Sequence, residues 1–291
     1  MLETNKYPSI SVIIPSFNQG QYIEETLVSV IGQQYPNLEV IVIDGGSTDN
    51  TVEIIEKYSS QITYWHSKKD KGQADAINQG MNLSTGEVLC WLNSDDMYLP
   101  GTLLDVGKKF AGRTDENYLI YGAAINIREG DRNLYSYTQP TTPFDKFTLT
   151  YLDFMAQPSA FWTRKLWEST GEINANYHYV IDWDWFIRAS RIVDFKSVQK
   201  FYSICRQHPF HKTSNGGSQR REEIREVVSK YSSEFWQELY VEVEKSYPNI
   251  SKFITEARIP KKNLLLPILF PGVASKIKKP QDLYTVLTMY G

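Results

Sequence analysis

Two adjacent carboxylates follow an apolar run in the stretch EVLCWLNSDD, residues 87–96. Residues 87–92 predict a buried strand, and Asp95 and Asp96 come directly after it. Two like charges beside each other at the end of a buried strand are costly unless something stabilises them. A metal ion, a basic partner and water alone are the three candidates.

Short apolar runs alternate with longer helical patterns on both sides of this stretch. Strands are predicted at residues 10–14, 38–43, 62–66 and 87–92, and helices at 22–33, 51–58, 74–82, 102–110 and 182–190. Asn50 and Glu53 form a predicted capping pair for the second helix. This alternation is typical of an α/β fold built on a mostly parallel sheet.

Acidic residues end two of these predicted strands. Asp44 closes the strand at 38–43 and opens the turn DGGSTD, residues 44–49. Ligands of open α/β sheets bind at the carboxyl ends of the strands. The same rule therefore places Asp44 and the pair Asp95 and Asp96 at one edge, which predicts a site there.

Composition excludes several classes of protein. The chain has 291 residues, 41% of them hydrophobic and 22% charged, with a formal net charge of -3, which fits a soluble globular protein rather than a nucleic-acid binder. The two cysteines, Cys90 and Cys205, lack the spacing of a zinc site or a disulfide framework. Neither a signal peptide nor a membrane-spanning run is predicted, so we expect a cytoplasmic protein.

Five motifs occur in a fixed order along the chain. They are SISVIIPSFN (9–18), VIDGGSTDNT (42–51), KGQADAINQG (71–80), NSDD (93–96) and YVIDWDWFIR (179–188). Each motif alone is weak, but their order and separations are specific. Across about residues 8–215 the chain resembles the family 2 glycosyltransferases.

This resemblance implies the GT-A fold, with a Rossmann-like, mostly parallel central sheet flanked by helices and a C-terminal helical extension. The glycosyltransferase domain is predicted at 1–217, with a nucleotide-sugar half at about 1–100 and an acceptor half at about 101–217. Residues 218–291 form the extension, because a charged helical pattern follows Gly217.

The resemblance also implies a DXD-like metal site for Mn²⁺ or Mg²⁺. Asp96 would bind the metal directly, Asp95 would lie near the ribose, and His208 would complete the metal site. A divalent cation stabilises the charge that develops on a diphosphate leaving group, and carboxylate oxygens suit both metals. A turn or helix-capping pair of aspartates, and a lone surface histidine, are the alternatives.

Further nucleotide contacts are implied at the strand ends, at Pro15, Ser16, Asn18, Asp44, Lys71 and Gln73. Asp44 would bind the base, although an Asx turn explains it as well. Gly45 stands where the family often has a second acid, and Ile77 where it often has an arginine. Lys71 could equally be a solvated lysine.

Asp182 is implied as the general base of an inverting transfer, which needs a carboxylate within reach of the attacking hydroxyl. Trp183, Asp184, Arg188 and Lys212 are predicted to contact the acceptor or the sugar. For Trp183 the alternative is packing in the core, and for Asp184 with Arg188 it is a structural ion pair.

The segment 258–279 combines basic residues with the apolar run LLLPILF, residues 264–270. Such a segment can bind an anionic membrane surface peripherally, which would place the protein at the inner face of the cell membrane. The alternative is packing on its own domain.

The predicted function is transfer of one sugar from a nucleotide-diphosphate sugar, with UDP as the default, to a saccharide or lipid-linked acceptor in cell-surface polysaccharide biosynthesis. A sugar nucleotidyltransferase is disfavoured because PSFNQG, residues 15–20, lacks the Gly-rich basic loop that this chemistry needs. A non-catalytic nucleotide-sugar or glycan-binding protein of the same fold is the alternative.

Overall fold

The computed structural model of the chain describes residues 7–128, 135–209, 211–212, 215–256, 271–277 and 279–290. Its contacts divide the chain into two compact units. The first comprises Met1–Phe144 and Met155–His211, and the second comprises Asp145–Phe154 and Lys212–Gly291. The second unit thus begins five residues before Gly217 and also takes in a short earlier segment.

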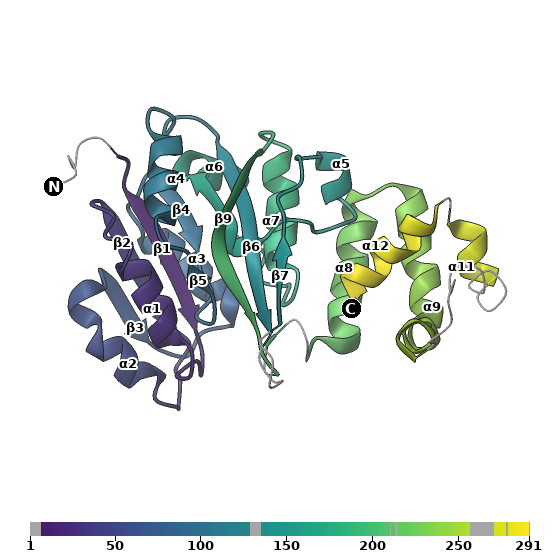
Figure 1. Cartoon of the computed structure of the whole chain (residues 1–291), viewed down its shortest axis with the longest axis horizontal. Coiled ribbons are helices and arrows are strands. Elements are labelled where there is room, and N and C mark those ends of the chain that lie inside the picture. Colours follow the sequence, from purple (N-terminus) through teal and green to yellow (C-terminus); the bar gives the residue numbers. More distant parts are fainter. Residues whose placement is uncertain are drawn as a thin grey trace. The chain divides into compact units, whose positions relative to one another are not determined.

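A single mixed sheet forms the centre of the first unit (Figure 1). Its strands are β1 (Ile10–Ser16), β2 (Leu38–Asp44), β3 (Tyr64–Ser67), β4 (Val88–Trp91), β5 (Met97–Tyr98), β6 (Leu119–Arg128), β7 (Tyr135–Gln139), β8 (Ala160–Thr163) and β9 (Lys196–Gln207). They are ordered β3-β2-β1-β4-β8-β6-β9-β5, with β7 paired to β6. The strand β6 is continuous over its ten residues and pairs with β7, β8 and β9.

The strand register brings the predicted ligand-binding ends together. The first four strands run parallel, and Ser16 pairs with Asp44, which pairs with Ser67. Ile13 pairs with Trp91, so the chain after β4 leaves the sheet at the same edge. The prediction that Asp44 and the two later aspartates share an edge is confirmed.

Helices of the first unit connect these strands. They are α1 (Ile23–Ile31), α2 (Thr51–Lys57), α3 (Gln73–Leu83), α4 (Thr102–Phe110), α6 (Arg164–Thr170) and α7 (Ile181–Ser190), with short 3-10 turns η2 (Ser59–Gln61) and η3 (Gln157–Ser159). The predicted Asn50 side-chain cap of α2 is wrong, because Asn50 makes no capping hydrogen bond. Asp49 instead accepts a hydrogen bond from the Thr51 N–H at 3.0 Å.

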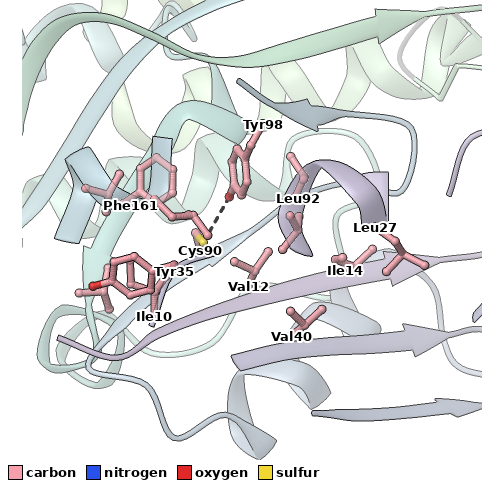
Figure 2. Packing of buried hydrophobic residues seen from close by; sticks show 14 of the residues in the cluster. Ile10, Val12, Ile14, Leu27, Tyr35, Val40, Cys90, Leu92, Tyr98 and Phe161 are labelled. Carbon is pink, nitrogen blue, oxygen red and sulfur yellow. Dashed lines mark hydrogen bonds between the residues drawn. The ribbon is translucent and has the colours of Figure 1, made fainter. Parts of the chain in front are cut away.

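Alternating residues of β1 point into a core cluster that includes side chains of α1, α4 and β4 (Figure 2). Val12 and Leu27 are fully buried there. Figure 2 shows the hydroxyl of Tyr98 pointing at Cys90, where it donates a hydrogen bond to the Cys90 sulfur at 3.3 Å. Because this face of the sheet is buried, apolar packing fixes the position of β4 and of the aspartates that follow it.

Other packing holds α3 and α7 in the first unit. A Cβ on Gly80 of α3 would lie 2.5 Å from Ile13, so only glycine permits this close approach to β1. Phe186 of α7 stacks on Trp91 of β4 with ring centres 6.5 Å apart. The helix α7 is therefore packed directly on the strand that leads to Asp95 and Asp96.

The second unit is helical. It contains α5 (Lys146–Leu149), α8 (Gly217–Tyr231), α9 (Glu234–Glu256), α11 (Pro271–Lys276) and α12 (Pro280–Tyr290). Tyr151 stacks on Trp236 with ring centres 3.8 Å apart. Among the helices that the structure describes, none has the length and apolar character needed to cross a membrane.

Part of the predicted membrane segment belongs to this unit. Val273 of α11 is buried, and Lys276 pairs with Glu238 of α9 at 2.6 Å. Residues 258–270, which include the apolar run, lie outside the described residues. For α11, packing on its own unit is what the structure shows.

Candidate active site

The antiparallel pairing of β5 with β9 brings the end of β9 next to Asp95 and Asp96. Met97 pairs with Ile204, so the end of β9 passes beside the turn that carries Asp95 and Asp96. The Arg206 N–H donates to Asp96 Oδ1 at 3.0 Å. The Arg206 side chain donates to the Asp95 carbonyl at 3.2 Å and pairs with Glu25 of α1.

The Asp96 carboxyl is buried, with a residue exposure of 5%. Burial and then the neighbouring Asp95 carboxylate raise the pKa of Asp96 well above its ordinary value, against hydrogen bonds from the Arg206 N–H and the Asn93 amide. Added positive charge stabilises the anionic form of a buried carboxyl beside a second one. This electrostatic state fits a cation ligand better than a surface turn.

His208 follows β9 and lies against the same pair. Its Nε2 atom is 3.2 Å from Asp95 Oδ2, and its ring lies 4.4 Å from that of Tyr22. The Nδ1 atom of His208 is buried and has no hydrogen-bond partner among the residues that the structure describes. His208 is therefore not the lone surface histidine of the alternative interpretation.

The beginning of α3 connects to the aspartate turn through two amides. Gln73 donates to Asn93 Oδ1 at 2.8 Å, and the Asn93 amide lies 3.4 Å from Asp96 Oδ2. Gln73 is therefore placed beside the site, where it orients Asn93. Lys71 is exposed, and its N–H donates to Asp75.

Carboxylate and imidazole groups, the donor types that divalent cations take, occur together at this edge. Within the described ranges, no group of three or more His, Cys, Asp or Glu side chains is arranged to hold a metal ion. Asp95 adjoins Asp96 in the same turn, and His208 Nε2 lies 3.2 Å from Asp95 Oδ2. Mg²⁺ commonly takes one or two protein carboxylates and completes its shell with substrate phosphates and water.

Asp44 is fully buried at the end of β2, and both of its carboxylate oxygens accept hydrogen bonds. Ser47 donates from its N–H at 2.8 Å and from its hydroxyl at 2.5 Å, and Ser67 donates at 2.6 Å. The N–H of Gly46 donates as well, at 3.1 Å. This geometry is the Asx turn that the sequence left open, and it argues against a direct contact between Asp44 and a base.

The first loop follows β1. Pro15 and Ser16 are buried, and the Ser16 carbonyl accepts a hydrogen bond from the Gly45 N–H at 2.8 Å. Asn18 has a φ of 52° and accepts a hydrogen bond from the Thr48 N–H at 2.9 Å, so it connects two loops.

One residue of this loop was missed by the sequence reasoning. Phe17 is 58% exposed at the ligand edge, although large aromatic side chains are usually buried. Its signal was its place inside the motif PSFN. An exposed ring here offers a flat apolar face to a ligand.

Asp182 lies in the first turn of α7 and is half-buried. One of its oxygens accepts a hydrogen bond from the Trp183 N–H at 2.9 Å. The partial positive charge of a helix N-terminus favours a carboxylate at this position. Because α7 returns the chain to the start of β9, its N-terminus faces the edge where β4 and β9 end.

The other residues predicted around Asp182 have structural positions. Trp183 is 1% exposed, so its ring offers no face to a sugar. Asp184 is fully buried and pairs with Arg188 at 2.9 Å, and Arg188 also donates to the carbonyls of Thr170 and Glu172. These positions argue against the predicted sugar or acceptor contacts of Trp183, Asp184 and Arg188.

Lys212 differs from these residues in belonging to the second unit, where its carbonyl accepts a hydrogen bond from the Asn215 N–H. Its predicted contact with the acceptor or the sugar stays a prediction.

Comparison with known proteins identifies the family of this chain. The family model described as "Glycosyl transferase family 2" matches residues 11–169. The chain belongs to glycosyl transferase family 2. Among its relatives, this glycosyltransferase is 31% identical over 189 residues to a "PGL/p-HBAD biosynthesis glycosyltransferase" of Mycobacterium bovis, covering 62% of this chain and 69% of the relative. An "Uncharacterized glycosyltransferase" of Rickettsia felis is 26% identical over 247 residues, covering 82% of this chain and 40% of the relative.

Solved structures show the same GT-A fold as this glycosyltransferase. S. aureus TarS 1–349 in complex with UDP-GlcNAc superposes with a TM-score of 0.60 at 17% identity, covering 97% of this chain and 90% of TarS 1–349. The mannosyltransferase PcManGT from Pyrobaculum calidifontis, in complex with GDP-Man and Mn²⁺, gives a TM-score of 0.54 at 19% identity and covers 99% and 75% of the two chains. The predicted fold class and the glycosyltransferase assignment are confirmed.

Proposed function

We propose that this glycosyltransferase transfers a single sugar, with inversion, from a nucleotide-diphosphate sugar to a hydroxyl group of a saccharide or lipid-linked acceptor. The observation that carries the proposal is the buried Asp96 carboxyl beside Asp95 and His208 at the carboxyl edge of the sheet. The TarS complex with UDP-GlcNAc supports a UDP-sugar as the donor. We place this transfer in cell-surface polysaccharide biosynthesis, and the mycobacterial relative named for PGL/p-HBAD biosynthesis supports a biosynthetic role.

Asp96 and His208 would hold Mn²⁺ or Mg²⁺, with Asp95 beside them near the ribose, and the Mn²⁺ complex of PcManGT supports this. The bound cation would neutralise charge on the diphosphate leaving group. Arg206 holds Asp96 through its N–H, and Gln73 holds Asn93 against the same carboxyl. These hydrogen bonds to Asp96 and Asn93 would keep the carboxylates in one orientation before a donor binds.

Asp182 is proposed as the general base. Its carboxylate would take the proton of the acceptor hydroxyl while that oxygen attacks the anomeric carbon from the face opposite the diphosphate. One C–O bond forms, the bond to the diphosphate breaks, and an α-linked donor yields a β-linked product. The proton resides on Asp182 until it is released to water.

The test is donor turnover by the full chain with Mn²⁺ or Mg²⁺ and a panel of nucleotide sugars, with nucleotide release as the readout. Asp96→Ala should lose metal-dependent nucleotide binding and turnover. Asp182→Asn should retain nucleotide binding but lose turnover by a factor of about 10² or more. Asp115→Asn, at an exposed carboxylate before β6, is the matched control and should behave as wild type.

Nuclear magnetic resonance of the product linkage checks the stereochemistry, because retention would contradict a single displacement. If no donor is bound or consumed with any acceptor in the panel, the non-catalytic interpretation replaces this proposal. If Asp182→Asn keeps wild-type turnover, another group acts as the base.

A further inference from the structure

Two arginines, Arg221 and Arg225, lie one turn apart on α8 in the second unit. The helices α8, α9 and α12 pack on one another there (Figure 1). Residues at this spacing on a helix have Cβ atoms about 5–6 Å apart, so the two side chains start from the same side of α8. Both arginines are only partly exposed. The second unit therefore places two positive charges beside each other at a half-buried position.

Two residues of α9 hold Arg221 in place. The Arg221 Nε–H donates to both oxygens of Glu244, at 3.1 and 3.3 Å, and the guanidinium lies over the Tyr247 ring, 4.7 Å from its centre. The terminal N–H groups of Arg221 form no hydrogen bond with any residue that the structure describes. Glu244 and Tyr247 therefore orient this guanidinium and leave its outer donors open.

Arg225 has no comparable acceptor. Its Nε atom is buried, and none of its N–H groups forms a hydrogen bond or an ion pair with a residue in the described part of the chain. Burial and then the Glu244 carboxylate raise the pKa of the Tyr290 hydroxyl of α12. The charges of Arg225 and Arg221 act on this pKa in the opposite direction, so both guanidiniums lie near the hydroxyl. A buried charged donor without an acceptor is unfavourable, and such groups in native proteins often meet an ion, a water or a ligand.

The charges and the donor geometry indicate the class of ligand. Glu244 compensates the charge of Arg221, so Arg225 leaves the cluster with one unmatched positive charge. A planar carboxylate is satisfied by a single guanidinium fork, whereas a tetrahedral phosphate can accept hydrogen bonds from two forks in different planes. Arginine clusters are a recurring means of recognising phosphate groups.

We propose that Arg221 and Arg225 bind a phosphate group in the second unit. The terminal N–H groups of both arginines donate to its oxygens. This site goes beyond the proposed function and does not depend on it, because both arginines lie outside the unit that carries the sheet. Two sources carry this chemistry, a soluble phosphate compound and a phospholipid headgroup.

The test is a titration of inorganic phosphate with the full chain, followed by the phosphorus NMR line width. Ionic strength is held constant, and EDTA excludes binding through a metal ion. Wild type should bind with a Kd of about 1 mM, and Arg225→Gln should weaken binding by about tenfold or more, as expected for lost charged hydrogen bonds. Sulfate should displace phosphate at a similar concentration, whereas acetate should require about ten times more.

Two further variants separate phosphate recognition from net charge. Arg225→Lys keeps the charge without the fork and should weaken binding by about threefold to tenfold. Lys230→Gln removes an exposed charge from the same helix and should stay within about twofold of wild type. Arg225→Gln should not lower Tm, because Arg225 makes no hydrogen bond or ion pair in the described part of the chain.

Vesicle sedimentation distinguishes the two sources of phosphate. If phosphatidylcholine vesicles that contain phosphatidic acid sediment wild type more than Arg225→Gln, the ligand is a lipid headgroup. If the two sediment equally while inorganic phosphate binds, the ligand is a soluble phosphate compound. The proposal is overturned if inorganic phosphate does not bind well above the expected Kd, if Arg225→Gln binds it as wild type does, or if acetate binds equally well.

Discussion

Asp182 and Asp184 are two residues apart on α7, and we predict opposite consequences for the same substitution. Asp184→Ala should destabilise the protein while leaving nucleotide binding within about twofold of wild type. Asp182→Ala should abolish turnover while changing the free energy of unfolding by less than about 1 kcal/mol, as expected for a half-buried residue outside the core.

The magnitude follows from the contacts. The Asp184 side chain is 1% exposed and its partner Arg188 is 24% exposed. Removing one partner of a buried pair costs about 3–5 kcal/mol. Arg188 keeps two carbonyl acceptors and some solvent contact, so we expect the lower end, about 3 kcal/mol. That cost corresponds to a fall in Tm of about 6–12 °C.

Differential scanning calorimetry, nucleotide titration and donor turnover measure stability, binding and catalysis for each variant. Replacing both charges, in Asp184→Leu with Arg188→Met, should recover part of the stability, because the uncompensated charge is gone although two carbonyls lose a donor. If Asp184→Ala lowers Tm by less than about 2 °C and removes acceptor-dependent turnover, the structural role of this pair is refuted. A contact between Asp184 and the acceptor would then be the better explanation.

Two further predictions concern thiols and acid. Burial raises the pKa of the Cys90 thiol to about 12. Burial and the nearby Asp96 carboxyl raise the pKa of the Cys205 thiol well above its ordinary value. Neither thiol should therefore react with a disulfide reagent at pH 8 until denaturant is added, and reaction of the native protein would contradict this. Burial raises the pKa of Asp105, but hydrogen bonds from Lys200 and Tyr202 outweigh it and leave a lowered value. A carboxyl whose pKa is lowered in the folded protein stabilises the fold above the unfolded-state pKa of about 3.9, and this stabilisation is lost as pH falls through the folded-state pKa. The difference in free energy of unfolding between wild type and Asp105→Asn should therefore be constant near pH 7 and disappear below about pH 4. Urea titrations across this pH range measure it.

The local sequence pattern was sufficient to predict the parallel strands of the sheet. Residues 10–14, 38–43 and 87–92 each combine an apolar run with a turn signal, and the positions of Asp44, Asp95 and Asp96 follow from strand direction alone. The cap of α2 was misassigned because Asp49 and Asn50 are neighbours with equivalent capping ability, and only the fold decides between them.

The burial and contacts of side chains that depend on tertiary packing could not be predicted from local pattern. Trp183 and Asp184 belong to a motif whose spacing is compatible with a site, yet their burial depends on how α7 meets β4. The contact between Asp70 and Gly45 joins two loops 25 positions apart, and no periodicity encodes it. The two-residue strand β5 is too short to carry a strand pattern.

The pairing of β5 with β9 has a consequence for how the enzyme is made. The hydrogen bond from Arg206 to Asp96 spans 110 residues, and the β9 strand joins the sheet only after β8 and α7 have been synthesised. Contacts of such sequence separation form late, because the closure entropy of the intervening chain must be offset first. On the ribosome, the segment up to residue 100 can pair its parallel strands, but its Asp96 carboxyl still lacks the hydrogen bond from the Arg206 N–H. A fragment ending before β9 should therefore lack affinity for metal and nucleotide even where its strands are formed.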